Sequence, residues 1–231
     1  MSKETTSVLP FTPETKGWSS ALDTSLPIDA ADIPGFVSWV NCNGFHLDRE
    51  TGKGHDGFDF GAYLREDGMI VVGLPQDTPI RAVANGVVRQ VLMNESTGMG
   101  YGCVVNVEHG GNDSGMFSSY VHVNPTIEPN VTVGKGDVLG SLYKDDGNQE
   151  GRLVHLHMGL ADGWGSHGTS IMGGGLILRQ QDPGLIDRSI YDTTVSRQGF
   201  EPFDYAEVPG ATGLALAHFA IVKTNGFVWT E

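Results

Sequence analysis

A series of short apolar runs, each closed by glycine or other turn residues, constrains the fold of this chain more than any other feature. In residues 80–93, Asn85-Gly86 stands between two stretches rich in β-branched residues, a pattern that predicts a β-hairpin. Further strands are expected at residues 36–40, 101–108 and 116–123, and on either side of the glycine-rich turn at 134–136. Because no convincing helical period occurs before residue 160, the pattern predicts an all-β sandwich or barrel-like domain.

The length of 231 residues allows one domain of fair size with sizeable extensions. We expect an extended lead-in over residues 1–34, a β domain over 35–160, and an extension over 161–231 that packs on the same domain. Residues 62–79 are rich in charged and turn residues, so they are expected to form a loop.

The charge balance bears on the partners of the chain. Lys and Arg number 14 and Asp and Glu 28, which gives a formal net charge of −14, and no basic run is present. Nucleic acid and anionic membrane surfaces are therefore poor candidates. No apolar run approaches the ~20 residues of a membrane span. The first six residues lack the apolar core of a signal peptide, so either the protein is made without a signal or the signal is missing from this chain. The sequence gives no indication of the oligomeric state.

The two cysteines, Cys42 and Cys103, allow one disulfide or none, and the sequence does not decide between them. Their separation also lacks the CxxC spacing of a thiolate metal site.

Two histidines alternate with apolar residues in the segment Leu153 to Gly159. In a strand, His155 and His157 would point to the same side, because residues two apart share a face. Imidazole is a frequent metal ligand and the usual general base near neutral pH. The segment therefore predicts a chemical site, and its partners have to come from other strands.

A second segment, residues 54–61, places His55 and Asp59 four residues apart. Three glycines argue against a helix, and Phe58 and Phe60 alternate with the aspartate as in a strand. A strand would then offer an imidazole and a carboxylate to one side.

A third strand carries His122, with Tyr120 two residues earlier and therefore expected on the same face. The other histidines are interpreted without a role in a site: His109 as a turn residue, His46 as a surface residue or one with satisfied hydrogen bonds, and His167 as a surface residue.

Together these segments supply two imidazoles and a carboxylate, which is the number of protein ligands that a catalytic zinc needs beside its open position. His55, Asp59 and His157 would form such a set. The ligand types alone do not exclude nickel, cobalt or iron as the bound metal. The remaining His122 and His155 would then serve to move protons or to stabilise a tetrahedral intermediate during hydrolysis.

The order of the three motifs resembles that of the lysostaphin/LytM-type zinc endopeptidases, which cleave peptide bonds in bacterial peptidoglycan. That family has an HxxxD segment, a YxH segment and an HxH segment, and this chain has them at residues 55–59, 120–122 and 155–157. Residues 77–88, 100–102 and 133–140 are also similar to sequence segments of that family. The resemblance covers about residues 54–160.

The resemblance implies an antiparallel fold of two sheets with the site in a groove on one of them. It also implies that His55, Asp59 and His157 bind one Zn²⁺ per chain and that His122 and His155 are catalytic. The substrate would be the peptide cross-links of peptidoglycan, and the location would be extracytoplasmic, in the cell envelope or secreted.

Two alternatives remain at this point. A non-catalytic relative would bind peptidoglycan or activate an amidase through the same groove, although such relatives usually have degraded ligand motifs. A phosphocarrier of the sugar-transport type also pairs histidines on a β-sandwich, but it would not need Asp59. The zinc content of the purified protein distinguishes the zinc endopeptidase from both alternatives.

Overall fold

The computed structural model describes residues 22–40, 44–45, 54–93, 102–111, 116–143, 154–164, 178–190 and 205–207. The predictions for His46 and His167 lie outside these residues. Cys42 lies outside them as well, so its pairing with the buried Cys103 stays undecided.

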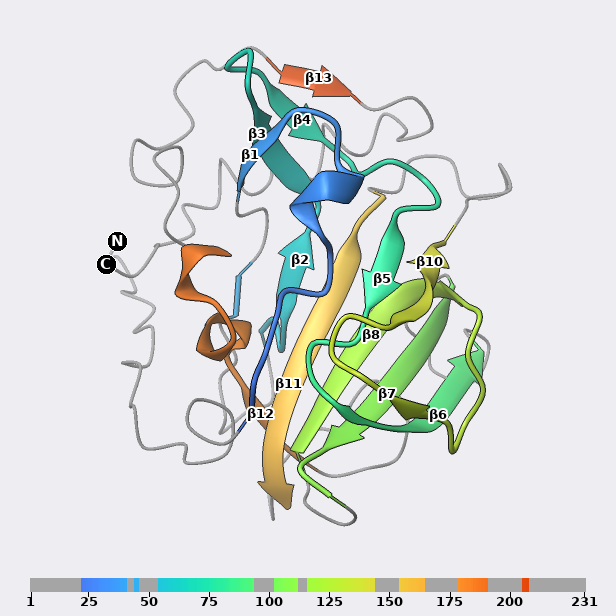
Figure 1. Cartoon of the computed structure of the whole chain (residues 1–231). Coiled ribbons are helices and arrows are strands. Elements are labelled where there is room, and N and C mark those ends of the chain that lie inside the picture. Colours follow the sequence, from blue (N-terminus) through green and yellow to red (C-terminus); the bar gives the residue numbers. More distant parts are fainter. Residues whose placement is uncertain are drawn as a thin grey trace, which may run out of the picture.

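The larger sheet contains nine strands in the described part of the chain, and every pair in it is antiparallel (Figure 1). Its central path runs β12-β11-β8-β7-β6-β9; β2 pairs with β11, and β10 pairs with both β8 and β5. The strands are β2 (Phe58–Phe60), β5 (Pro79–Arg81), β6 (Gly86–Met93), β7 (Cys103–His109), β8 (Met116–Pro125), β9 (Thr132–Val133), β10 (Val138–Leu142), β11 (Leu156–Trp164) and β12 (Leu178–Gln181).

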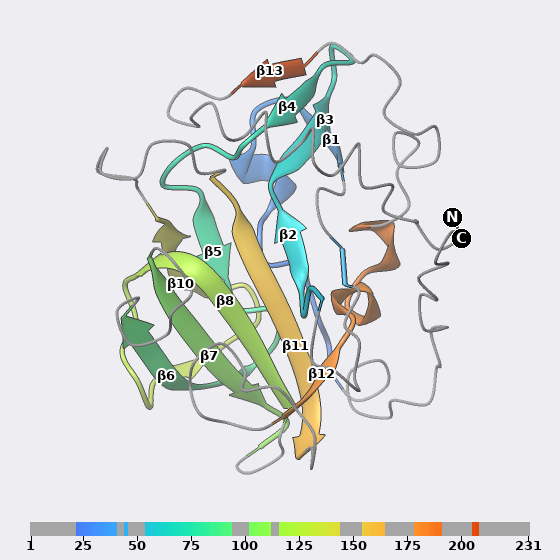
Figure 2. The same cartoon turned by 180° about the vertical axis from the view of Figure 1, so that it is seen from behind.

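A smaller sheet lies at one end of the larger one, as both views show (Figures 1 and 2). It has the order β1-β3-β4-β13, with β13 parallel to β4. Its strands are β1 (Phe36–Trp39), β3 (Ala62–Arg65), β4 (Ile70–Val72) and β13 (Tyr205–Glu207).

Helical structure in the described residues is limited to three short 3₁₀ turns, η1 (Ala30–Asp32), η3 (Pro183–Leu185) and η4 (Arg188–Ile190). The predicted all-β, antiparallel fold class is therefore confirmed. Within the same residues, no helix has the length and apolar character needed to cross a membrane.

The loop predicted over residues 62–79 is wrong, because this segment contains the hairpin β3–β4. Its charged residues are concentrated in the tight turn between the strands, where Gly68 adopts a φ of 82°. Arg65 and Asp67 form an ion pair beside that turn. The apolar residues on either side of the turn were too few to predict strands by themselves.

The hairpin predicted at Asn85-Gly86 is also wrong, since β5 pairs with β10 and β6 pairs with β7 and β9. Asn85 instead accepts a hydrogen bond on Oδ1 from the Lys135 amide at 2.8 Å. A Cβ on Gly86 would lie 2.4 Å from the Glu108 carbonyl oxygen, so the glycine allows close approach of β7. An Asn-Gly pair thus marks a strand start here, not a turn between paired strands.

The main hydrophobic core lies on one face of the larger sheet. Along β11, Leu156, Met158 and Leu160 are buried in this core, whereas His157 alternates with them. On β8, Tyr120 belongs to the main core and Val121 to a small separate cluster. Alternation along each strand therefore gives the sheet a second face, and this second face carries His157.

The segment before β1 packs on the strands that follow. The Ser25 amide donates to the Val83 carbonyl at 2.8 Å, and the Arg81 amide donates to the Pro27 carbonyl at the same distance. Ile33 is buried in the main core. The division of the chain after residues 34 and 160 stays a prediction.

Candidate metal centre

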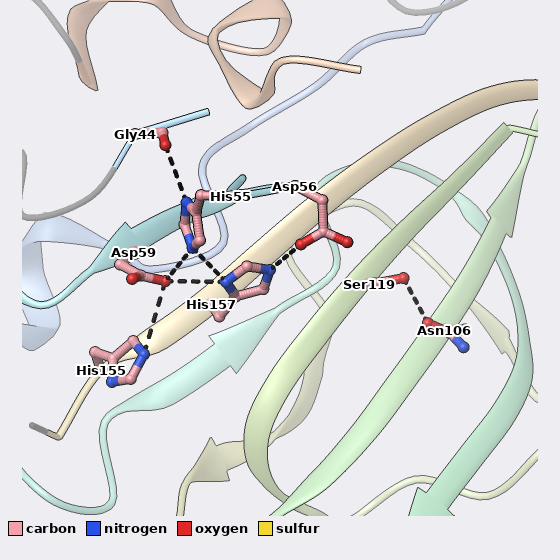
Figure 3. Close-up of polar contacts among 8 residues, drawn as sticks. All are labelled: Gly44, His55, Asp56, Asp59, Asn106, Ser119, His155 and His157. Carbon is pink, nitrogen blue, oxygen red and sulfur yellow. Dashed lines mark hydrogen bonds and ion pairs between the residues drawn. The ribbon is translucent and has the colours of Figure 1, made fainter. Parts of the chain in front are cut away.

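Three side-chain atoms converge at one point beside β11 (Figure 3). His55 Nε2 lies 2.9 Å from His157 Nδ1 and 3.2 Å from Asp59 Oδ1. His157 Nδ1 lies 3.0 Å from the same carboxylate oxygen. The structure thus brings together the three residues predicted as metal ligands, as a group able to hold an ion.

Sheet register places two of these residues. Asp59 on β2 stands directly opposite His157 on β11 in an antiparallel pair. His55 precedes β2 and is not part of a strand, contrary to the predicted strand over residues 54–61. Its ring is fixed by a contact of 3.0 Å between Nδ1 and the Gly44 carbonyl oxygen.

The contact with Gly44 determines the tautomer of His55. A carbonyl oxygen only accepts hydrogen bonds, so Nδ1 of His55 carries the hydrogen and donates it. In the neutral ring, Nε2 then presents its lone pair to Asp59 and His157. Metal-binding histidines typically donate their second ring nitrogen to such an acceptor.

Charge is concentrated in this cluster, and the pKa values respond to it. Burial alone would raise the pKa of Asp59, but the surrounding His55, His155 and His157 hold it well below its usual value. Burial alone would lower the pKa of His157, but Asp56 and Asp59 outweigh it and raise the pKa to about 9. The pKa of Asp56 is lowered because His157 outweighs the effect of burial.

The donor set and its spacing fit a zinc ion. Two imidazole nitrogens and one carboxylate oxygen are common zinc ligands. Bonds of roughly 2.0–2.2 Å in a tetrahedral site place ligand atoms about 3.3–3.6 Å apart. The three observed separations, 2.9, 3.0 and 3.2 Å, are slightly shorter than that spacing.

The two remaining histidines border this cluster. His155 Nε2 lies 3.7 Å from Asp59 Oδ1, and the ring centroids of His155 and His122 are 4.6 Å apart. His155 was predicted to lie within a strand, but it immediately precedes Leu156, the first residue of β11. The structure therefore gathers all five predicted residues, while their roles stay predictions.

His122 reaches this place through a β-bulge. Along β7 and β8, Val104 stands opposite Val121 and Cys103 opposite Val123, so His122 is an extra residue on β8. Its φ is 66°, an uncommon value for a residue other than glycine. The bulge turns the histidine towards His155.

The bulge corrects the predicted orientation of the Tyr-x-His motif. Tyr120 does not share a face with His122, because it is fully buried in the main core. Its hydroxyl accepts hydrogen bonds from the Val83 amide and from Ser118 Oγ, both at 2.9 Å. Simple alternation failed here because a bulge has no signature in the residue spacing.

His109 is the last residue of β7 and is completely buried, so its predicted place in the turn is wrong. Its ring nitrogens contact the Asn85 carbonyl oxygen at 2.9 Å and Ser118 Oγ at 2.8 Å. It is not one of the three residues that form the candidate metal cluster.

The face of the sheet that carries His157 also has a row of polar side chains. Ser119 Oγ donates to Asn106 Oδ1 at 2.5 Å (Figure 3), and Asn106 Nδ2 donates to Gln90 Oε1 at 2.9 Å. Ser119 and Asn106 are buried. The row links β8, β7 and β6 through side-chain hydrogen bonds on this face of the sheet.

Two contacts of the cluster had no counterpart in the sequence predictions. One is the Gly44 carbonyl, and the other is Asp56, whose Oδ1 lies 3.4 Å from Nε2 of His157. Strict alternation in a strand would place Asp56 on the side opposite His55 and Asp59. An acidic residue next to a predicted ligand was the one available signal; a backbone carbonyl gives none.

Comparison with known families agrees with the motifs. The model of Peptidase family M23 matches residues 66–167, less than half of the chain. This segment contains His122, His155 and His157, whereas His55 and Asp59 lie before it. Over the matched residues the chain is similar to the M23 peptidases, so the resemblance seen in the motifs is confirmed.

Solved structures similar to this chain include a zinc-containing peptidase from Vibrio cholerae. It has 19% identity and a TM-score of 0.36, and the match covers 68% of this chain and 37% of that one. The antimicrobial peptidase lysostaphin from Staphylococcus simulans has 16% identity and a TM-score of 0.43, with 74% of this chain and 58% of that chain covered. This chain thus spans less than two thirds of either protein. No curated protein sequence gives a match to the chain.

Proposed function

We propose that this protein is a zinc-dependent endopeptidase that hydrolyses the peptide cross-links of bacterial peptidoglycan. The observation that carries the proposal is the convergence of His55, Asp59 and His157 on one point, with separations of 2.9–3.2 Å. The match to the M23 family over residues 66–167 supports the reaction class and the substrate class.

His55 Nε2, Asp59 Oδ1 and His157 Nδ1 would hold one zinc ion. When bound, zinc supplies a Lewis acid and lowers the pKa of water from about 15.7 towards about 7, so that a nucleophile is present at neutral pH. With three protein ligands, a bound zinc would have a further position available for this chemistry.

His122 and His155 would act on the reacting peptide bond. Their rings lie side by side, and His155 also contacts Asp59, so both are held next to the ligand cluster. A neutral imidazole at either position accepts a proton from the attacking water, and an imidazolium donates one to the leaving amine. Either ring in its protonated form also stabilises the negative charge that develops on the carbonyl oxygen.

We infer the substrate class from the similarity to the family, as short cross-link peptides that contain glycine or alanine. Such a substrate places the enzyme outside the cytoplasm, in the cell envelope or secreted. The net charge of −14 gives no attraction to an anionic cell wall. Recognition would therefore depend on the peptide bound beside the metal cluster and not on long-range charge.

Digestion of purified sacculi tests this proposal. The protein is incubated with sacculi alone, with a chelator, and with the chelator followed by zinc, and released fragments are identified by mass spectrometry. We expect cleaved cross-link peptides in the first and third samples only. Binding to sacculi with no fragments in any sample would support the alternative, a non-catalytic relative that uses the same groove.

A further inference from the structure

The ring of His157 has two nitrogens in different surroundings. Nδ1 faces Asp59 and His55, whereas Nε2 points to the other side and is buried. Within the described residues, Nε2 makes no well-directed hydrogen bond, and the acidic group beside it is Asp56, with Oδ1 at 3.4 Å. Burying a polar nitrogen without a hydrogen bond destabilises the folded protein. The position of Asp56 beside Nε2 therefore needs an explanation.

Metal binding at Nδ1 determines what Nε2 must do. A neutral imidazole has one acceptor nitrogen and one donor nitrogen, so a ring that gives its Nδ1 lone pair to a cation carries its hydrogen on Nε2. That hydrogen requires an acceptor, and a carboxylate is a strong one. Asp56 offers such an acceptor at the correct edge of the ring.

We propose that Asp56 is a positioning residue that orients His157 for metal binding by accepting a hydrogen bond from Nε2. The inference deepens the proposed function and rests on the zinc centre described there. Asp56 would act on the metal through His157 and would not itself be a ligand, because its contact is with the nitrogen on the far side of the ring.

Gly57 supports this assignment because it leaves space for the ring. A Cβ at this position would lie 2.6 Å from Nε2 of His157 and 2.4 Å from the Met158 carbonyl oxygen. The segment His55-Asp56-Gly57 therefore contributes a ligand, an acceptor for the second histidine, and the gap into which that histidine fits.

The two histidine ligands then have matching arrangements. His55 donates from Nδ1 to the Gly44 carbonyl oxygen at 3.0 Å and turns Nε2 to the cluster. His157 uses the opposite nitrogens, with Nδ1 in the cluster and Nε2 towards Asp56. Each ring is oriented by an acceptor outside the cluster, which is the usual support for a metal-binding histidine.

The test compares zinc affinity in the full-length wild type, in Asp56→Asn and in Asp56→Ala. Asp77→Asn is the matched control: it removes the same charge from an exposed residue whose φ of 65° asparagine tolerates well. The dissociation constant is measured by competition with a chromogenic chelator. We expect it to rise about 10- to 100-fold in Asp56→Ala and less in Asp56→Asn, which keeps an acceptor oxygen, with no change in the control.

A second readout separates orientation from general destabilisation. In zinc-loaded protein with ¹⁵N-labelled histidine, the Nε2 hydrogen of His157 should exchange slowly in the wild type and faster in Asp56→Ala. The Nδ1 hydrogen of His55 is hydrogen-bonded to the Gly44 carbonyl oxygen. Its exchange rate should be the same in both proteins and serves as an internal control. If Asp56→Ala does not fold, Asp56→Asn, which has nearly the same shape, decides the question by both measurements.

The possible failures are distinguishable. If the wild type binds one zinc and both Asp56 variants bind it with the affinity of Asp77→Asn and unchanged hydrogen exchange, the role of Asp56 is overturned while the zinc centre stands. If the wild type takes up no zinc, the proposed centre fails and the role of Asp56 fails with it.

Discussion

Nδ1 of His157 lies 3.0 Å from Oδ1 of Asp59, although 98 positions separate the two residues in the chain. They meet because β2 and β11 pair in a register that sets the two residues opposite each other. A one-residue slip between these strands would move one side chain to the other face of the sheet. The site therefore depends on the register of the sheet as well as on the residues themselves.

Replacing His157 with alanine should remove zinc and activity together. His157 supplies one of three converging atoms, and two ligands hold zinc far more weakly than three. Bound zinc is measured by elemental analysis after gel filtration, alongside release of peptides from sacculi. A variant that keeps a full equivalent of zinc would show that His157 is not a ligand.

Replacing His122 with asparagine should leave zinc in place and lower the rate about 10²- to 10⁴-fold, the usual contribution of a general acid or base. Asparagine is chosen because it tolerates the φ of 66° at this bulge, so the backbone should keep its path. The measurement pairs zinc content with kcat. Unchanged kcat in a variant with normal zinc would mean that His122 only fills space beside His155.

The Tyr-x-His strand illustrates what the sequence could predict and what it could not. Residue types and spacing were enough to predict an all-β fold and to single out five residues that the structure brings together, because strands have a periodic signature. The bulge at His122, the acceptor role of Gly44 and the approach of Asp56 to His157 depend on how separate segments pack. Asn85-Gly86 shows the same limit, since its glycine is required by the neighbouring β7 and not by a local turn.

Replacing Gly102 with alanine should disturb His122 and lower the rate, while zinc stays bound. The added Cβ would lie 2.9 Å from the His122 Cα, and Gly102 also has a φ of 71°. Gly68→Ala is the control, because Gly68 has a φ of 82° but open space around its Cβ position. Backbone strain alone costs roughly 1–2 kcal/mol in both variants, so Gly102→Ala should lose more stability than this.

Chemical denaturation and sacculi digestion of both glycine variants check this expectation. Equal losses of stability and equal rates in the two variants would show that the contact between Gly102 and His122 has no consequence for catalysis.

His109 should make the metal-free protein less stable in acid. Burial lowers the pKa of His109 to about 4, although its hydrogen bond to the Asn85 carbonyl opposes this effect. Below the unfolded-state pKa of about 6.5, His109 binds a proton in the unfolded chain. In the folded protein it binds this proton only when the pH falls to about 4. This group therefore contributes a stabilisation that is complete above pH 6.5 and falls by up to about 3 kcal/mol as the pH drops to 4.

His109→Gln isolates this contribution, because all other titrating groups are common to both proteins. Urea unfolding in the presence of a chelator, at several pH values between 7 and 4, gives the free energy of unfolding of each protein. The difference between wild type and variant should shrink as the pH falls. A constant difference over this range would show that His109 is protonated equally in both states.

The central claim is that His55, Asp59 and His157 bind a single zinc ion, and anomalous X-ray scattering from crystals of the zinc-loaded protein tests it most directly. Data collected on both sides of the zinc absorption edge should give one strong difference peak per chain, within bonding distance of His55 Nε2, Asp59 Oδ1 and His157 Nδ1. A map without a peak at this point, or with its peak at other residues, would contradict the claim.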